Sequence, residues 1–184
     1  MSSKIRVAIV GVGNCASALV QGVEFYRKTG NEEGIPGLMH ANLGGYRIDD
    51  IEFSAAFDVS TTKVGRSLAD AIGAPPNNTC RFVDSVRNGV MVHRGPTLDG
   101  LGKYLTGVVE ESKDPVDDVA AILKRTETDI MVCYLPVGSQ RAAEWYAEQA
   151  LAAGCGFVNC IPVFIASDER WRNRFAAEIG RAHV

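Results

Sequence analysis

The sequence predicts an α/β protein built on a doubly wound parallel sheet. Short apolar runs rich in β-branched residues recur along the chain, and stretches with helical spacing separate them. Such runs are typical of parallel strands that are buried on both faces. Alternation of strands and helices predicts right-handed crossovers. A glycine-rich turn directly after the first run is the third observation, since such turns join strand to helix in these sheets.

The first strand and its helix are the clearest pair of elements. Ile5–Val10 is the strand, and the spacing of apolar residues predicts a helix from Cys15 to about Lys28. Four residues at i, i+3 or i+4 spacing are expected to face the sheet: Ala18, Leu19, Gly22 and Phe25.

An insertion and the second strand follow. Residues 29–46 carry five glycines and many polar residues, which is typical of a loop, so we expect an insertion at about 29–46. Ile51–Phe57 is the second strand and ends on Asp58. A helix that contains Lys63 and Ile72 comes next, and Pro75-Pro76 ends it.

The middle of the chain has the weakest patterns. Gly89–His93 is consistent with a third strand. Arg94–Tyr104 has no clear period and is expected to be a loop or the start of a short helix. Pro115 at a first helical position predicts an amphipathic helix over Val116–Arg125.

The last elements have clear boundaries. Asp129–Leu135 is a buried strand, and Gly138-Ser139 begins a helix that runs to about Ala153. Gly154 ends that helix, because glycine is favoured just after a helix C-terminus. Gly156–Ile161 is the last strand, and Pro162 closes it.

Composition excludes several function classes. Hydrophobic residues make up 46% of the 184 residues and charged residues 22%, with a net charge of −3. That balance predicts no nucleic-acid or anionic-membrane partner, because both need a basic face. No apolar run approaches the ~20 residues of a membrane span, and the short start leaves no room for a signal peptide. Together with an odd count of five cysteines, this predicts a cytoplasmic protein with reduced thiols.

Histidines and cysteines offer no metal or nucleophile pattern. The spacing of His40, His93 and His183 fits no zinc motif, so we expect no metal site. Cys155 and Cys160 lie around a strand and are expected to be buried core thiols.

The turn after the first strand predicts dinucleotide binding. Gly11, Gly13 and Ala16 form a G-x-G-x-x-A pattern between a strand and a helix. Gly11 permits the tight turn, Gly13 lets the backbone approach a pyrophosphate, and Ala16 keeps the helix close to the sheet. The alternative is a tight turn that binds no nucleotide.

Asp58 at the end of the second strand is the candidate ribose ligand. Its carboxylate can accept both adenosine-ribose hydroxyls and would repel a 2′-phosphate, which favours NAD over NADP. No arginine follows it closely. Asp58 lies about twice as far from the glycine turn as the usual ~20 residues, and the insertion accounts for the excess. The alternative is a solvated acid or a helix cap.

Two further strand ends carry candidate ligands. The turn with Tyr134, Leu135, Pro136 and Gly138 would face the nicotinamide half of the cofactor, or else be a plain helix start with Ser139 as its cap. Asn159 at the end of the last strand, followed by Cys160, Ile161 and Pro162, is either ligand-facing or hydrogen-bonded to neighbouring loops, and we favour the first. Asp99 and Lys103 could touch a phosphate, although solvated loop charges are more common.

These motifs together resemble the inositol-3-phosphate (myo-inositol-1-phosphate) synthases, most closely the shorter bacterial and archaeal type. The resemblance runs from about Ile5 to about Phe175 and covers the N-terminal, NAD-binding Rossmann portion of that family. Six segments carry it in order and spacing: VAIVGVGNCASALVQGVEFY, GLMH, AAFDV, RGPTLDGLGKY, YLPVGS and FVNCIPVFIAS.

The resemblance implies an NAD-dependent isomerase of inositol and phospholipid biosynthesis. Such enzymes convert D-glucose 6-phosphate to 1D-myo-inositol 3-phosphate by oxidation, aldol cyclisation and reduction with bound NAD, and they act as homotetramers. By resemblance, Gly11, Gly13, Asn14 and Cys15 hold the pyrophosphate and Asp58 holds the adenosine ribose. The strand ends at 134–139 and 159–162 line the nicotinamide side.

The resemblance also implies what this chain lacks. The family's second α/β domain supplies the catalytic lysines and the assembly surface, and no segment here matches it. We therefore expect no catalytic residue in this chain, weak NAD binding, no turnover and uncovered apolar surface. The alternatives are an NAD-dependent dehydrogenase of the homoserine-dehydrogenase or glucose-fructose-oxidoreductase kind, and a non-enzymatic NAD-binding module.

The last residues depart from the family pattern. Residues 1–177 are expected to be the Rossmann domain and 178–184 (EIGRAHV) a non-native tail. Those seven residues can be encoded by a widely used short-read sequencing adapter whose next codon is a stop. A natural divergent tail is the alternative.

Overall fold

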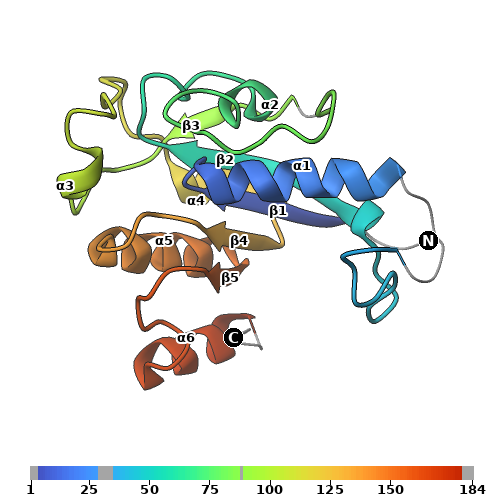
Figure 1. Ribbon diagram of the computed structural model, residues 1–184. Helices are drawn as coiled ribbons and strands as arrows, with labels where there is room; N and C mark the ends of the chain where they lie inside the picture. Colours follow the sequence, from blue (N-terminus) through green and yellow to red (C-terminus); the bar gives the residue numbers. More distant parts are fainter. Residues whose placement is uncertain (1–3, 29–34, 88, 180–184) are drawn as a thin grey trace.

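The computed structural model describes residues 4–28, 35–87 and 89–179 and contains one five-stranded parallel sheet (Figure 1). Its strand order is β3-β2-β1-β4-β5, with every pair parallel. The strands are β1 Ile5–Val10, β2 Ile51–Asp58, β3 Val92–Arg94, β4 Ile130–Cys133 and β5 Gly156–Asn159. This order confirms the predicted doubly wound sheet. It reverses direction between β1 and β4, and ligands bind at such a switch point.

Helices cover both faces of the sheet because side chains alternate along the strands. On β1, Val7 and Ile9 join the core formed with α1 (Asn14–Lys28) and α2 (Leu68–Ala71). Ala8 and Val10 point the other way, toward the core formed with three later helices. These are α4 (Val119–Arg125), α5 (Gln140–Ala153) and α6 (Glu169–Ile179). The short α3 (Gly102–Leu105) and the 3-10 helix η1 (Ile48–Asp50) lie in connections.

The buried face of α1 differs from the predicted one. Ala18 and Phe25 are exposed, whereas Ala16, Val20 and Val23 are buried against the sheet. The glycine turn sets the rotation of the helix so that Ala16 faces the sheet, and residues at i+4 and i+7 follow it. Phe25 instead packs edge-on against Phe82, with 6.3 Å between ring centroids.

Two predicted helices are shorter than their apolar spacing indicated. Around Lys63 the chain forms turns, and α2 begins only after Ser67, whose side chain accepts a hydrogen bond from the Asp70 N–H. Gly65 in the turn has a φ of 78°, outside the helical region. Similarly, α4 begins at Val119 because Asp118 caps it. Side-chain caps thus override apolar spacing at both starts.

The other boundaries lie close to those expected. Gly154 ends α5 in the left-handed region, with a φ of 75°. Of the predicted insertion, residues 29–34 lie outside the described residues, and the rest forms turns closed by a bridge between Leu43 and Tyr46. The helix α6 extends through Ile179, and residues 180–184 of the predicted tail are not among those described.

Candidate functional site

A cavity of about 460 Å³ lies at the carboxyl ends of the strands, where the strand order reverses. The ends of β1, β2 and β4 form its floor, and the loops around residues 76–78 and 96–109 form its walls. Seven of the predicted ligand residues line it: Gly11, Gly13, Asn14, Asp58, Tyr134, Leu135 and Pro136. These seven residues thus lie around one cavity, and their role as ligands stays a prediction.

Gly11 is required by the close approach of two strand ends. Its φ is 85°, and a β-carbon built on it would lie 2.9 Å from the Tyr134 carbonyl oxygen. Its N–H donates to the Phe57 carbonyl oxygen at 2.9 Å. The glycine thus joins the ends of β1, β2 and β4 at one point, where a side chain would force them apart.

Gly13 differs from Gly11 because space surrounds it. A β-carbon built on it would meet no heavy atom within 4 Å, and the residue lines the cavity. Helix α1 begins at the next residue, so its unpaired N–H groups and the positive end of its dipole lie here. An open backbone at a helix N-terminus fits a pyrophosphate.

Asp58 is nearly buried and holds three backbone N–H groups. Its Oδ1 accepts from the N–H groups of Val59 and Ser60 at 2.7 and 2.9 Å. Its Oδ2 accepts from the Val12 N–H at 2.8 Å. The carboxylate therefore fixes the glycine turn as well as lining the cavity.

Lys63 is a cation beside Asp58 that the sequence analysis did not single out. Its ammonium lies 3.9 Å from Asp58 Oδ2 and donates to Asn77 Oδ1 at 3.0 Å, with only 6% of its side chain exposed. Burial lowers the pKa of Lys63, and the Asp58 charge partly offsets that. The sequence analysis placed Lys63 within a helix, and nothing in the sequence pattern indicated that its side chain lies beside the end of β2.

Residues 77–79, which follow the proline pair, are hydrogen-bonded to the glycine turn. The Asn77 amide donates to the Val12 carbonyl oxygen at 3.0 Å. Asn14 Oδ1 accepts from the N–H groups of Asn78 and Thr79 at 2.9 and 3.1 Å. The Asn14 side chain is thus engaged with this segment at the edge of the cavity. These residues were not predicted as part of the site, because two asparagines in a loop have no characteristic spacing from the glycine turn.

The turn after β4 only partly follows the prediction. Tyr134, Leu135 and Pro136 line the cavity, whereas Gly138 and Cys15 are not among its lining residues. Burial raises the pKa of the Tyr134 phenol, with smaller contributions from Cys160 and Cys15.

The start of α5 is capped from a distant loop. Asp99 Oδ1 and Oδ2 accept from the N–H groups of Arg141 and Ala142 at 3.0 and 2.7 Å. Ser139 occupies the cap position but makes no side-chain cap hydrogen bond. Asp99 is therefore neither a solvated loop charge nor free to touch a phosphate, and the alternative of Ser139 as a side-chain cap is wrong.

Tyr146 of α5 also lines the cavity. The residue is 2% exposed, and its ring lies 6.1 Å from that of Phe57. No hydrogen bond to its hydroxyl is found within residues 4–28, 35–87 and 89–179. Burial raises the pKa of the phenol, and the Asp58 charge adds to this. Gly95 makes room for the hydroxyl, since a β-carbon there would collide with it.

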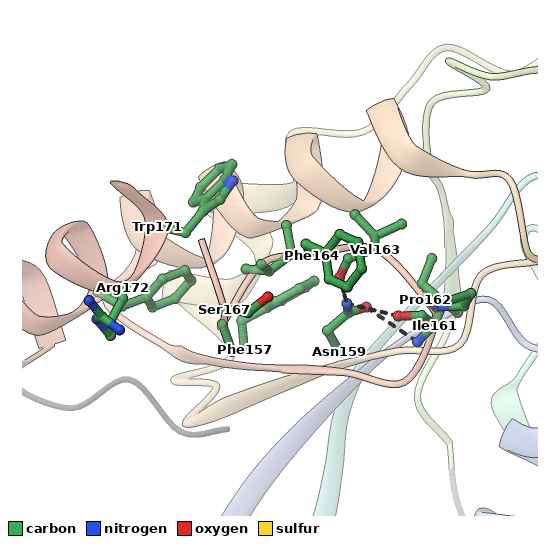
Figure 2. A pocket seen from close by; sticks show the side chains of 12 residues that line it. Phe157, Asn159, Ile161, Pro162, Val163, Phe164, Ser167, Trp171 and Arg172 are labelled. Atoms are coloured by element: carbon green, nitrogen blue, oxygen red, sulfur yellow. Dashed lines mark hydrogen bonds between the residues drawn. The ribbon is translucent and has the colours of Figure 1, made fainter. Parts of the chain in front are cut away.

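Asn159 and Pro162 lie at a different cavity, of about 320 Å³, between the end of β5 and α6 (Figure 2). The Asn159 amide donates to the carbonyl oxygens of Ile161 and Val163 at 3.0 and 2.6 Å. The side chain thus holds its own loop, which is the alternative that the sequence analysis ranked second. A ligand role for either residue stays a prediction.

The cysteines divide by position. Cys155 is buried as expected, and burial raises its pKa to about 12. The expectation that Cys160 is a buried core thiol is wrong, because that residue is exposed in the loop after β5. Strand β5 ends at Asn159, so Cys160 is the first residue after the strand and is not part of the sheet.

Two kinds of feature are absent from the described part of the chain. No group of three or more histidine, cysteine, aspartate or glutamate side chains is arranged there to hold a metal ion. None of the helices described is long and apolar enough to span a membrane.

Comparison with known proteins gives matches in sequence and in structure. The inositol-3-phosphate synthase of Corynebacterium glutamicum is 53% identical over 175 residues, which cover 95% of this chain and 48% of that protein. The protein of the same name from Mycolicibacterium smegmatis is 52% identical over 174 residues, covering 95% and 48%. The chain spans about half the length of the curated relatives that it matches. No protein-family model matches it.

Among solved structures, a crystal structure of Ari2 superposes with a TM-score of 0.81 at 33% identity, covering 96% of this chain and 52% of that one. A myo-inositol-1-phosphate synthase-related protein from Thermotoga maritima superposes with a TM-score of 0.73 at 22% identity, covering 95% and 52%. The latter likeness supports the fold alone.

Proposed function

Because this chain is related to the inositol-3-phosphate synthases over about half of their length, we propose that it is the dinucleotide-binding part of such an enzyme. The single observation that carries the proposal is the open backbone of Gly13, which lies in the same cavity as the nearly buried Asp58. A pyrophosphate at the first and a ribose at the second are the two halves of an adenosine diphosphate group.

The cofactor proposed is NAD. Gly13 and the first residues of α1 would bring backbone N–H groups to the pyrophosphate, whereas Gly11, whose N–H donates to Phe57, would only permit the turn. The Asp58 carboxylate would take a ribose hydroxyl. Leu135 and Pro136 supply apolar surface for the nicotinamide half. When bound, NAD supplies hydride uptake and hydride return. The residues of this chain bind and orient it at the edge of the sheet.

We propose that the whole enzyme isomerises D-glucose 6-phosphate to 1D-myo-inositol 3-phosphate. Oxidation, cyclisation and reduction would then share one retained cofactor, so no net NADH forms. On this proposal the groups that act on the sugar phosphate belong to the half of the relatives' length that this chain does not match. Assembly as a homotetramer and a place in the cytoplasm are further parts of the proposal.

Binding of NAD by the 184-residue chain tests the cofactor. We expect saturable binding by titration calorimetry, and we expect Gly13→Val to abolish it by filling the approach to the backbone. Gly22→Val is the matched control, because a β-carbon there also meets nothing within 4 Å but lies in mid-helix. No binding by the parent chain, or equal binding by Gly13→Val, would refute the proposal.

A chimera tests the reaction. This chain would replace the matching half of the Corynebacterium glutamicum relative, and the product from glucose 6-phosphate would be identified. We expect inositol phosphate with no net NADH. Accumulation of NADH would instead favour a dehydrogenase of the homoserine-dehydrogenase or glucose-fructose-oxidoreductase kind.

A further inference from the structure

The hydrogen bonds of Asp58 leave room for one ligand hydroxyl. A carboxylate offers about four acceptor lone pairs. The N–H groups of Val59 and Ser60 occupy Oδ1, and the Val12 N–H occupies one site on Oδ2. Lys63 lies 3.9 Å from Oδ2, beyond hydrogen-bond distance, so about one lone pair remains. Asp58 therefore cannot accept from both hydroxyls of a ribose, contrary to the expectation from sequence.

Lys63 is placed to meet the second hydroxyl. Its ammonium has three donors, and one is used by Asn77 Oδ1 at 3.0 Å. The residue lines the same cavity as Asp58, and its side chain is 94% buried, so the ammonium is held in place rather than moving freely in solvent. Asn77 in turn is fixed by its bonds to the carbonyl oxygens of Val12 and Ile72.

We propose that Lys63 is the second residue that reads the adenosine ribose, and that the Asp58–Lys63 pair sets the choice between NAD and NADP. Asp58 accepts from one hydroxyl, and Lys63 donates to the oxygen of the other. This inference rests on the proposed dinucleotide site and adds a specificity residue to it.

The pair has opposite effects on a 2′-phosphate. The Asp58 carboxylate repels a phosphate dianion, whereas the Lys63 ammonium attracts it. With both present, the opposing charges lie 3.9 Å apart and the repulsion from Asp58 keeps NADP out. Without Asp58, a buried ammonium remains with no carboxylate beside it. Removal of the acid alone should thus convert the site toward NADP, and removal of both should not.

The test measures NADP and NAD affinities of four chains by titration calorimetry: the parent, Asp58→Ala, Lys63→Met and the double variant. We expect Asp58→Ala to raise the ratio of NADP affinity to NAD affinity at least about tenfold over the parent. In the double variant we expect this ratio to be about tenfold lower than in Asp58→Ala. A ratio is used because general damage to the glycine turn weakens both dinucleotides together. Lys63→Met alone should weaken NAD about tenfold.

Lys124→Met is the matched control. It removes an exposed lysine in the last turn of α4, which leads into the amino end of β4, whereas the cavity lies at the carboxyl ends of the strands; it should leave both affinities unchanged. Thermal melts report whether each variant folds.

The outcomes separate the two proposals. If the parent chain binds neither dinucleotide, the proposed function fails. If the parent binds NAD while Asp58→Ala and the double variant show the same ratio, the role of Lys63 is refuted. If Asp58→Ala binds neither dinucleotide, Lys63→Met provides the test. An NAD affinity of Lys63→Met equal to that of the parent would then refute the role of Lys63.

Discussion

Tyr146 combines near-complete burial with a hydroxyl that makes no hydrogen bond to the described part of the chain. Among the described residues no fully buried side-chain polar atom lacks a hydrogen-bond partner, so this hydroxyl meets the open space of the cavity rather than an apolar core. Because the residue lines the main cavity, its hydroxyl is a candidate contact for a ligand or an ordered water. The ring itself is well packed against Phe57, so the hydroxyl can be tested separately from the ring.

We predict that Tyr146→Phe leaves the free energy of unfolding unchanged or raises it by up to about 1 kcal/mol. The variant keeps the ring and removes only a hydroxyl that makes no hydrogen bond to the described part of the chain. Denaturant unfolding measures the change, with the 80%-exposed Tyr104 as control in Tyr104→Phe. A loss of stability of about 1 kcal/mol or more would show that the hydroxyl is satisfied in the folded chain.

At the residue scale, the sequence predicted the groups that a motif defines. Gly11, Gly13 and Asp58 follow strand ends, and strand ends meet at one edge of a parallel sheet. Lys63 and Asn77 come to the same place through turns, and their side chains have no required spacing from the glycines. Such contacts depend on loop geometry, and loops have no periodic sequence pattern from which their geometry could be predicted.

At the element scale, Asp99 connects the loop after β3 to α5. Its two carboxylate oxygens take the N–H groups of the second and third helical residues, the positions that a cap normally serves. The negative charge also lies at the positive end of the helix dipole. This loop forms one wall of the main cavity, so the cap fixes that wall as well as the helix.

We expect Asp99→Ala to lower the free energy of unfolding by about 1 kcal/mol, within a range of about 0.5–2. Asp84→Ala, which alters an exposed loop acid, should change it little. Chemical denaturation compares the two. Equal stability of Asp99→Ala and the parent would mean that α5 needs no cap from this loop.

Glu148 on α5 and Arg174 on α6 form a two-pronged ion pair between the helices. The Arg174 hydrogen bonds hold the pKa of Glu148 below its ordinary value of 4.5. A carboxyl with a depressed folded pKa stabilises the protein above its unfolded pKa and loses that contribution as pH falls through the folded value. Both side chains are more than 40% exposed, so the effect is small.

The predicted result is a pH-dependent difference between the parent and Glu148→Gln. At neutral pH the variant should be less stable by less than about 1 kcal/mol, and the two should converge well below pH 4.5. Urea unfolding at a series of pH values measures this. A difference that persists unchanged in acid would assign the effect to packing rather than charge.

The elements themselves were predicted where their pattern is periodic. All five strands and the long helices α1 and α5 agree with the apolar runs that indicated them. The helix around Lys63 was predicted too long. Gly65 has a positive φ and Ser67 is the N-cap of α2, and neither feature affects the spacing of apolar residues. The face of α1 was wrong because two neighbouring stripes on the helix have similar hydrophobicity.

At the scale of the whole molecule, strand β5 is an edge of the sheet, since among the described residues it pairs with β4 alone. Strand β5 lies at the end of the strand order, and the cavity of about 320 Å³ lies beside it (Figure 2). Phe164 in its lining is 82% exposed. Exposed apolar surface next to a strand edge favours self-association.

We predict that the chain enhances the fluorescence of an apolar dye and self-associates at high concentration. Phe164→Asp should reduce both, whereas Met39→Asp, at a residue 91% exposed within the predicted insertion, should not. Dye titration and sedimentation velocity measure the two effects. A monomeric parent chain without dye enhancement would contradict the prediction.

The pairing of β1 with both β2 and β4 also has a consequence in time. Val10 pairs with Cys133, so about 120 residues must be synthesised between the two partners of the central strand. At the usual 5–20 residues per second, one edge of β1 waits about 6–24 s for its neighbour. During that interval Val10, which is fully buried in the finished sheet, lacks the part of its core cluster that α5 and α6 supply. Newly made chains should therefore depend on chaperones that shield apolar strands until translation has passed β4.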